Sequence, residues 1–179
     1  MKKTMMTEVV MTILMIVLGV LGFYFLGGTA KTWLVPLLSV MVLLGFLVRW
    51  QFVLTAGILM PFITALLTLQ GDFSWAAIIV EVAVLTITGL LICFAYQYWR
   101  WDAHPSLVFG ILFGRVLGGC VAWLLKAVFA MGTFSNLFSY TVNSLVSEIC
   151  GIAVLLAVVP LLVRFVFQKM FHVATKRKK

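Results

Sequence analysis

The chain has 179 residues, of which 64% are hydrophobic and 10% are charged, and its formal net charge is +8. A soluble domain carries about 25% charged residues, so this composition excludes a domain with a water-facing surface and indicates an integral membrane protein. The basic residues flank apolar runs and are densest at 176–179. This distribution is typical of topology determinants and of contacts with membrane lipid headgroups, and it argues against a nucleic-acid partner.

Six apolar runs are each about as long as a membrane-spanning helix, which needs about 20 residues. In chain order, the predicted spans cover residues 7–26, 33–48, 52–69, 75–99, 106–131 and 140–167. The breaks at 27–30, 71–72 and 100–105 contain glycine, proline or charged residues. We therefore predict a single all-α integral membrane domain over 1–179, a bundle of six transmembrane helices followed by a basic tail at 169–179.

The distribution of Lys and Arg predicts the orientation of this bundle. With the N-terminus in the cytoplasm, ten basic residues fall on the cytoplasmic side, and the outer loops hold Lys31. The ten are Lys2, Lys3, Arg49, Arg100, Arg164, Lys169, Lys176, Arg177, Lys178 and Lys179. Because positive charge in short loops favours the cytoplasmic side, we predict that both ends of the chain are cytoplasmic.

Two stripes run along the fifth predicted span. Gly110, Gly114 and Gly118 recur every four residues, a spacing that lets another helix approach closely. A neighbouring stripe places Arg115 and Lys126 on one face. We therefore expect this helix to use one stripe for packing and the other for charged contacts.

Four ionisable residues lie at membrane depth, namely Glu81, Arg115, Lys126 and Glu148. Such residues are costly in a bilayer and by default face the interior of the bundle, where they suggest a functional site. One explanation is that the four charges pair with one another and hold the bundle together, above all at Arg115. The other is that they contact a ligand.

The sixth predicted span carries a continuous polar-to-small face on its outer half. Its members, at helical spacing, are Tyr140, Asn143, Ser144, Ser147, Glu148 and Gly151. Trp75 and Trp123 lie near the same level, where aromatic side chains belong either to the interfacial belt or to a ligand-stacking site. Apolar walls with a few convergent polar groups are typical of a small-molecule pocket, and we predict one that opens to the outside.

Several chemistries have no signature in the sequence. It contains no G-x-S-x-G or H-E-x-x-H motif and no glycine-rich phosphate loop. The cysteines Cys93, Cys120 and Cys150 lie in apolar runs without metal-ligand spacing, which is typical of core residues. We therefore predict no enzyme activity, no cofactor and no bound metal, and any ATP-driven transport would need partner subunits.

Four stretches of the chain resemble the substrate-binding S components of energy-coupling factor (ECF) vitamin transporters. The first is 55–61 with Gly57 and Pro61, the second is Glu81 followed by Gly89, and the third is Gly114-Arg115-Val116. The fourth is 151–163, which is similar to the family's closing G-I-x-L-Q-L-x-x-I-P-x-L-V helix, with Leu155 or Leu156 in the Gln place. The likeness covers about residues 45–168, and the length and predicted topology agree with that family.

The resemblance implies a bacterial plasma-membrane protein that captures a water-soluble vitamin or vitamin precursor from outside. It also implies assembly with a transmembrane T component and two cytoplasmic ATPase subunits. The substrate contacts would come from Glu81, Lys126, Asn143, Glu148, Trp75, Trp123, Tyr140, Ser144, Ser147 and Arg115. These groups do not choose between a cationic, a carboxylate and a neutral vitamin. The alternative function is a non-transporting membrane scaffold of the MreD-like cell-elongation type, which has a similar size and a related helical layout.

Overall fold

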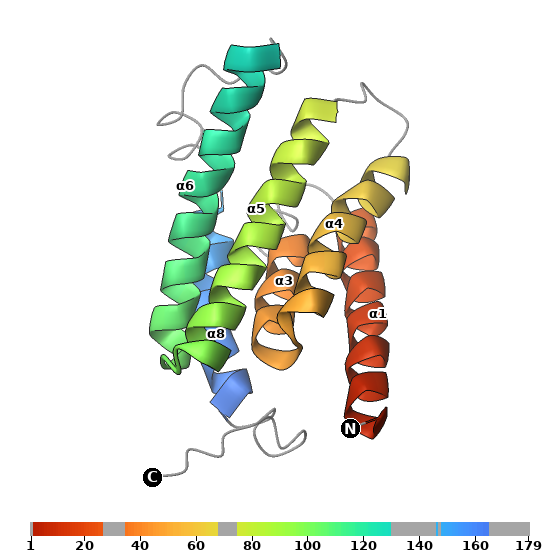
Figure 1. The fold of residues 1–179 in the computed structure, drawn as a ribbon, viewed down its shortest axis with the longest axis vertical. Helices are drawn as coiled ribbons and strands as arrows, with labels where there is room; N and C mark the ends of the chain where they lie inside the picture. Colours follow the sequence, from red (N-terminus) through yellow and green to blue (C-terminus); the bar gives the residue numbers. More distant parts are fainter. Residues whose placement is uncertain (1, 27–34, 68–74, 130–145, 147, 165–179) are drawn as a thin grey trace.

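The computed structural model describes residues 2–26, 35–67, 75–129, 146 and 148–164, and every element within these ranges is a helix. The elements are α1 (Lys2–Phe25), α3 (Pro36–Leu47), α4 (Trp50–Leu67), α5 (Trp75–Cys93), the π-helical turn η1 (Phe94–Tyr98), α6 (Ala103–Phe129) and α8 (Ile149–Leu162). They form one elongated bundle (Figure 1). Each of the six predicted spans overlaps one of these α-helices.

Four stretches are long and apolar enough to cross a membrane. They are Met5–Phe25, Trp50–Leu67, Ile78–Tyr98 and Ala103–Val121, whereas the apolar helices α3 and α8 are shorter. Four such helices are those of a multi-pass membrane protein. The predicted all-helical class is therefore confirmed for the described residues, and the four long apolar helices fit the predicted multi-pass membrane protein.

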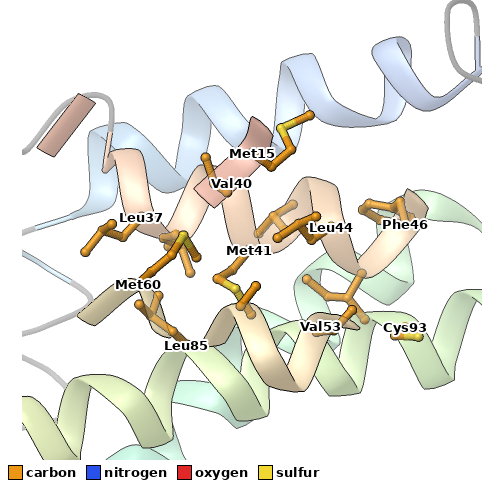
Figure 2. Packing of buried hydrophobic residues seen from close by; sticks show 14 of the residues in the cluster. Met15, Leu37, Val40, Met41, Leu44, Phe46, Val53, Met60, Leu85 and Cys93 are labelled. Carbon is orange, nitrogen blue, oxygen red and sulfur yellow. The ribbon is translucent and has the colours of Figure 1, made fainter. Parts of the chain in front are cut away.

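The short helix α3 forms the centre of the described bundle. It contacts α1, α4 and α5, and eight of its residues are buried, including Met41 and Leu44. Figure 2 shows these two side chains in one cluster with Met15 of α1, Met60 of α4 and Leu85 of α5. A helix that is hydrophobic on all sides is stable when other helices surround it, and α3 has this composition because Ser39 is its one polar residue.

The glycine stripe of α6 packs directly against α5. A Cβ atom added at Gly110, Gly114 or Gly118 would overlap Ile92, Thr88 or Val84 of α5, respectively. These three partners are themselves spaced by four residues, so the two helices meet along matching ridges. The predicted packing role of the stripe is confirmed.

Two further glycines bring other helices close to α5. A Cβ at Gly45 of α3 would lie 2.8 Å from the Gly89 carbonyl oxygen, and one at Gly57 of α4 would lie 2.8 Å from the Thr86 Cα. Helices in a membrane associate largely through such close contacts, because lipid removes the hydrophobic driving force between them. Helix α5 is therefore held on three sides, by α3, α4 and α6.

One end of the bundle gathers basic residues, and we call it the basic end. In Figure 1, the start of α1, the junction of η1 with α6 and the end of α8 all lie at this lower end. The basic residues at these positions and at the α3–α4 junction are Lys2, Lys3, Arg49, Arg100 and Arg164. The other described basic residues, Arg115 and Lys126, lie within α6.

Candidate functional site

Arg115 lies near the middle of α6 and is one of the few buried polar residues of the described core. Its position follows from the glycine before it. Gly114 lies against Thr88 of α5, so the α6 backbone is held close to α5 at this level. The Arg115 side chain is 8% exposed, and a guanidinium this deeply buried requires an anionic or carbonyl partner.

The partner of Arg115 is Glu148, whose carboxylate Oε2 accepts a hydrogen bond from Nη2 of Arg115. Glu148 is the residue before the first turn of α8, and its side chain is 22% exposed. The pair therefore joins α6 to α8, which pack together in the bundle. Of the two explanations for Arg115, pairing between buried charges is the contact present, and ligand binding stays a prediction.

The backbone at Glu148 differs from the expected continuous helix over 140–167. Val146 is helical, Glu148 has φ −107° and ψ 9°, and α8 begins at Ile149. Glu148 therefore lies at an interruption, and its side chain makes no capping hydrogen bond to α8. The Glu148 carboxylate pairs with Arg115 of α6 and does not cap its own helix, α8.

Three buried polar atoms on α5 and α6 have no hydrogen-bond partner among the described residues. They are Oγ1 of Thr86, Oγ1 of Thr88 and Nε of Arg115. Buried polar atoms are usually hydrogen-bonded, so each exception needs an explanation. Thr88 lies against Gly114, the residue before Arg115. Oγ1 of Thr88 and Nε of Arg115 therefore belong to facing levels of α5 and α6.

The other predicted site residues are placed as follows. Glu81 is half-buried on α5, while Trp75 and Trp123 are 58% and 52% exposed. Such exposure agrees with the interfacial belt, the first of the two explanations for these tryptophans. The side chains of Lys126, Tyr140, Asn143, Ser144 and Ser147 lie outside the described part of the chain, so their proposed contacts stay predictions.

No group of three or more His, Cys, Asp and Glu side chains within the described ranges could hold a metal ion. Cys93 is buried, Cys120 is half-buried and Cys150 is exposed, and all three are free thiols. A second set of polar contacts lies at the basic end instead, and sequence reasoning missed most of it.

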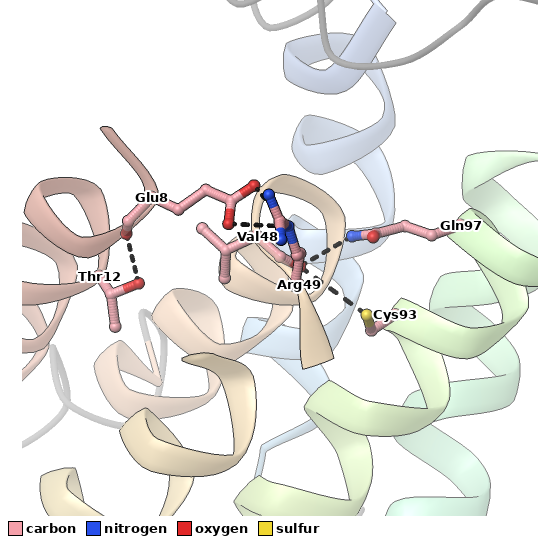
Figure 3. A network of polar contacts seen from close by, with 6 residues as sticks. All are labelled: Glu8, Thr12, Val48, Arg49, Cys93 and Gln97. Carbon is pink, nitrogen blue, oxygen red and sulfur yellow. Dashed lines mark hydrogen bonds and ion pairs between the residues drawn. The ribbon is translucent and has the colours of Figure 1, made fainter. Parts of the chain in front are cut away.

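This basic-end network links three parts of the bundle (Figure 3). Nε of Arg49 donates to Oε1 of Glu8 at 3.3 Å, which ties the α3–α4 junction to α1. Nε2 of Gln97 donates to the carbonyl oxygens of Gly45 at 3.1 Å and Val48 at 2.9 Å. Gln97 thus satisfies carbonyls at the end of α3 that have no partner within that helix.

The sequence offered a weak signal for this network. Glu8 and Gln97 are polar residues near the ends of apolar runs, where polar residues are ordinary interfacial groups. The π-helical turn η1 carries Gln97 to the end of α3, and nothing in the residue pattern predicts that turn. The position of Arg49 between two apolar runs indicates a topology determinant, and its ion pair with Glu8 adds a structural contact.

Replacing Gln97 with leucine is expected to lower the free energy of unfolding by about 1–3 kcal/mol, because the Gly45 carbonyl loses its donor and the Val48 carbonyl keeps only the weak Cys93 thiol donor. The measurement is thermal or denaturant unfolding in detergent. Gln51→Leu is the matched control, since Gln51 is exposed on α4. Equal stability of the two variants would contradict a capping role for Gln97.

The chain matches no protein-family model, no curated protein and no solved structure. Within the described residues, the Arg115–Glu148 pair and the basic-end network are two sets of side-chain contacts between charged or amide groups of different helices.

Proposed function

We propose that the chain is the membrane-embedded substrate-binding subunit of an ECF-type transporter. It captures a water-soluble vitamin or vitamin precursor from outside and delivers it through partner subunits that use ATP. The observation that carries the proposal is the Arg115–Glu148 ion pair in the interior of the bundle. Ionisable residues at membrane depth are costly, and where they persist they mark ligand or ion sites.

Six spans with both chain ends in the cytoplasm form part of this proposal. The start of α1 and the end of α8 lie at the same end of the bundle (Figure 1), which supports an even number of crossings. The described basic residues outside α6 lie at that same end, as cytoplasmic residues would. The site then faces the opposite side, from which a nutrient would enter.

The motifs that resemble the S components fall on elements that pack closely. Gly57 of α4, Gly89 of α5 and Gly114 of α6 each lie where a Cβ atom would clash with a neighbouring helix. This supports a structural reason for the glycines of the resemblance, with Arg115 placed by the glycine that precedes it. A T component and two ATPases are the partners that the resemblance implies, because the sequence has no phosphate loop of its own.

The proposal predicts that the purified protein carries a small molecule. We expect mass spectrometry of material released from gently purified protein to find a vitamin-sized compound, and Glu81→Ala to lower its retained amount at least tenfold. Glu8→Ala is the matched control, because Glu8 is a carboxylate of the basic end. Absence of any bound compound, together with uptake that is unchanged in Glu81→Ala, would contradict the proposal.

The scaffold function remains the second candidate, because Arg115 and Glu148 are already paired with each other. Such a pair could serve to hold α6 against α8 without any ligand. Copurification separates the two functions. An ATPase pair in the purified complex supports transport, whereas cell-wall synthesis proteins support the scaffold.

A further inference from the structure

The N-terminus of α8 adjoins Arg115 through Glu148, the residue before its first turn. The first backbone hydrogen bond of α8 runs from Ile152 N to Glu148 O at 2.9 Å. The N–H groups of the residues between them therefore precede the hydrogen-bonded part of the helix and give its start a partial positive charge. Glu148 makes no side-chain bond to these groups.

Arg115 adds a full positive charge whose hydrogen bonds are incompletely used. Its guanidinium presents five donors in a fixed fork that matches a carboxylate with two parallel bonds. In the structure, Nη2 bonds to Glu148, while Nε is buried and has no partner among the described residues. Glu148 therefore satisfies part of the fork and leaves a buried donor for a second acceptor.

We propose that the Arg115 guanidinium and the start of α8 bind the carboxylate group of the captured small molecule, and that Glu148 occupies this site while it is empty of ligand. This inference rests on the proposed function and names its substrate class. The unsatisfied features of the site are positive or hydrogen-bond donating, namely Nε of Arg115 and the helix N-terminus. A ligand that completes them supplies acceptors, which favours an anion over a cation.

Glu148 is the partner that moves when the ligand carboxylate enters. Its side chain is 22% exposed, whereas that of Arg115 is 8% exposed. It also lies at the interruption before α8, where the backbone leaves the helical conformation. Arg115, by contrast, is fixed in the middle of α6, which is held against α5 by three close glycine approaches. The carboxylate of Glu148 thus acts as an internal competitor for the ligand.

The test measures binding of matched probe pairs to the full-length protein in detergent. Nicotinate, pantothenate and biotin carry a carboxylate, and nicotinamide, pantothenol and biotin amide are their neutral counterparts. We expect one carboxylate probe to bind at least tenfold more tightly than its neutral counterpart by equilibrium dialysis. If no carboxylate of the panel binds in preference to its counterpart, the inference is overturned.

Two variants separate a ligand site from a merely structural ion pair. Glu148→Gln removes the competing charge but keeps an acceptor for Arg115, and we expect it to tighten carboxylate binding about threefold to tenfold. Arg115→Gln is expected to weaken the same binding at least tenfold. Weakening of similar size in both variants would show that the pair only supports the fold. If Arg115→Gln does not fold, unchanged or weaker binding by Glu148→Gln is sufficient to reject the inference.

The inference and the proposed function can fail separately. A copurified cationic or neutral compound, together with an ATPase pair, would leave the proposed function standing and overturn the carboxylate site. Copurified cell-wall synthesis proteins without a bound compound would overturn both.

Discussion

Replacing Arg115 with leucine is expected to lower the free energy of unfolding by about 3 kcal/mol, because the change leaves the Glu148 carboxylate without its partner in the bundle. The expected loss is at the lower end of the range for broken buried pairs, since Glu148 keeps 22% of its side chain exposed. Denaturant unfolding of the purified protein in detergent gives this number. Replacing the other partner, Glu148→Leu, is expected to lower the free energy of unfolding by at least as much, because it leaves the more deeply buried Arg115 unpaired.

The double variant Arg115→Leu with Glu148→Leu provides the decisive comparison. Removing both charges leaves no unpaired ion, and apolar replacements of buried pairs are often neutral or stabilising. We therefore expect the double variant to be more stable than either single variant. If the two single losses simply add in the double variant, Arg115 and Glu148 are not coupled, and the ion pair does not join α6 to α8 in the membrane.

Replacing Gly114 with alanine is expected to destabilise the protein by about 1–3 kcal/mol, because the added methyl group overpacks the interface between α5 and α6. A Cβ at this position would overlap Oγ1 of Thr88 and lie 2.9 Å from its Cβ and 3.0 Å from its Cα. The Cα belongs to the backbone, so rotation of the threonine side chain cannot relieve the clash. Thermal unfolding in detergent measures the effect.

Gly19→Ala is the matched control for Gly114→Ala. Both glycines lie in helices and face a neighbouring helix, but a Cβ at Gly19 would meet side-chain atoms only, Sδ of the flexible Met60 at 3.0 Å and Cγ2 of Val40 at 3.3 Å. We expect the control to lose much less stability. Adding Thr88→Ala to Gly114→Ala should restore part of the loss and not all of it, because the clash with the α5 backbone remains. Equal losses at Gly19 and Gly114 would contradict the close approach of α5 and α6.

The sequence predicted the features that depend on local periodicity. Apolar runs located the six α-helices of the described residues, because the length of a run and its hydrophobicity decide whether a helix can lie in a bilayer. The four-residue spacing of Gly110, Gly114 and Gly118 predicted a packing face, since residues four apart share one side of a helix. The structure adds the identity of the partner helix, α5, which periodicity cannot supply.

Features that depend on distant parts of the chain were not predictable in the same way. Arg115 and Glu148 are 33 residues apart, and four buried charges allow more than one pairing. The interruption at Glu148 has no glycine or proline beside it, so the polar spacing from 140 to 151 favoured one continuous helix. Gln97 reaches the end of α3 through the turn η1, which depends on packing. Sequence patterns describe each helix alone, whereas these interactions arise when helices meet.

The depth that the short central helix α3 covers does not depend on the thickness of the surrounding bilayer. With 12 residues, α3 is about 18 Å long at about 1.5 Å per residue, against about 30 Å for the hydrocarbon core of a bilayer. In a bilayer, lipid would contact the longer helices around it, such as α1 with its many exposed apolar side chains. A thicker or thinner bilayer would therefore tilt or strain these outer helices. It would leave the depth covered by α3 unchanged, because α3 is anchored at the basic end through Gln97 and is surrounded by protein.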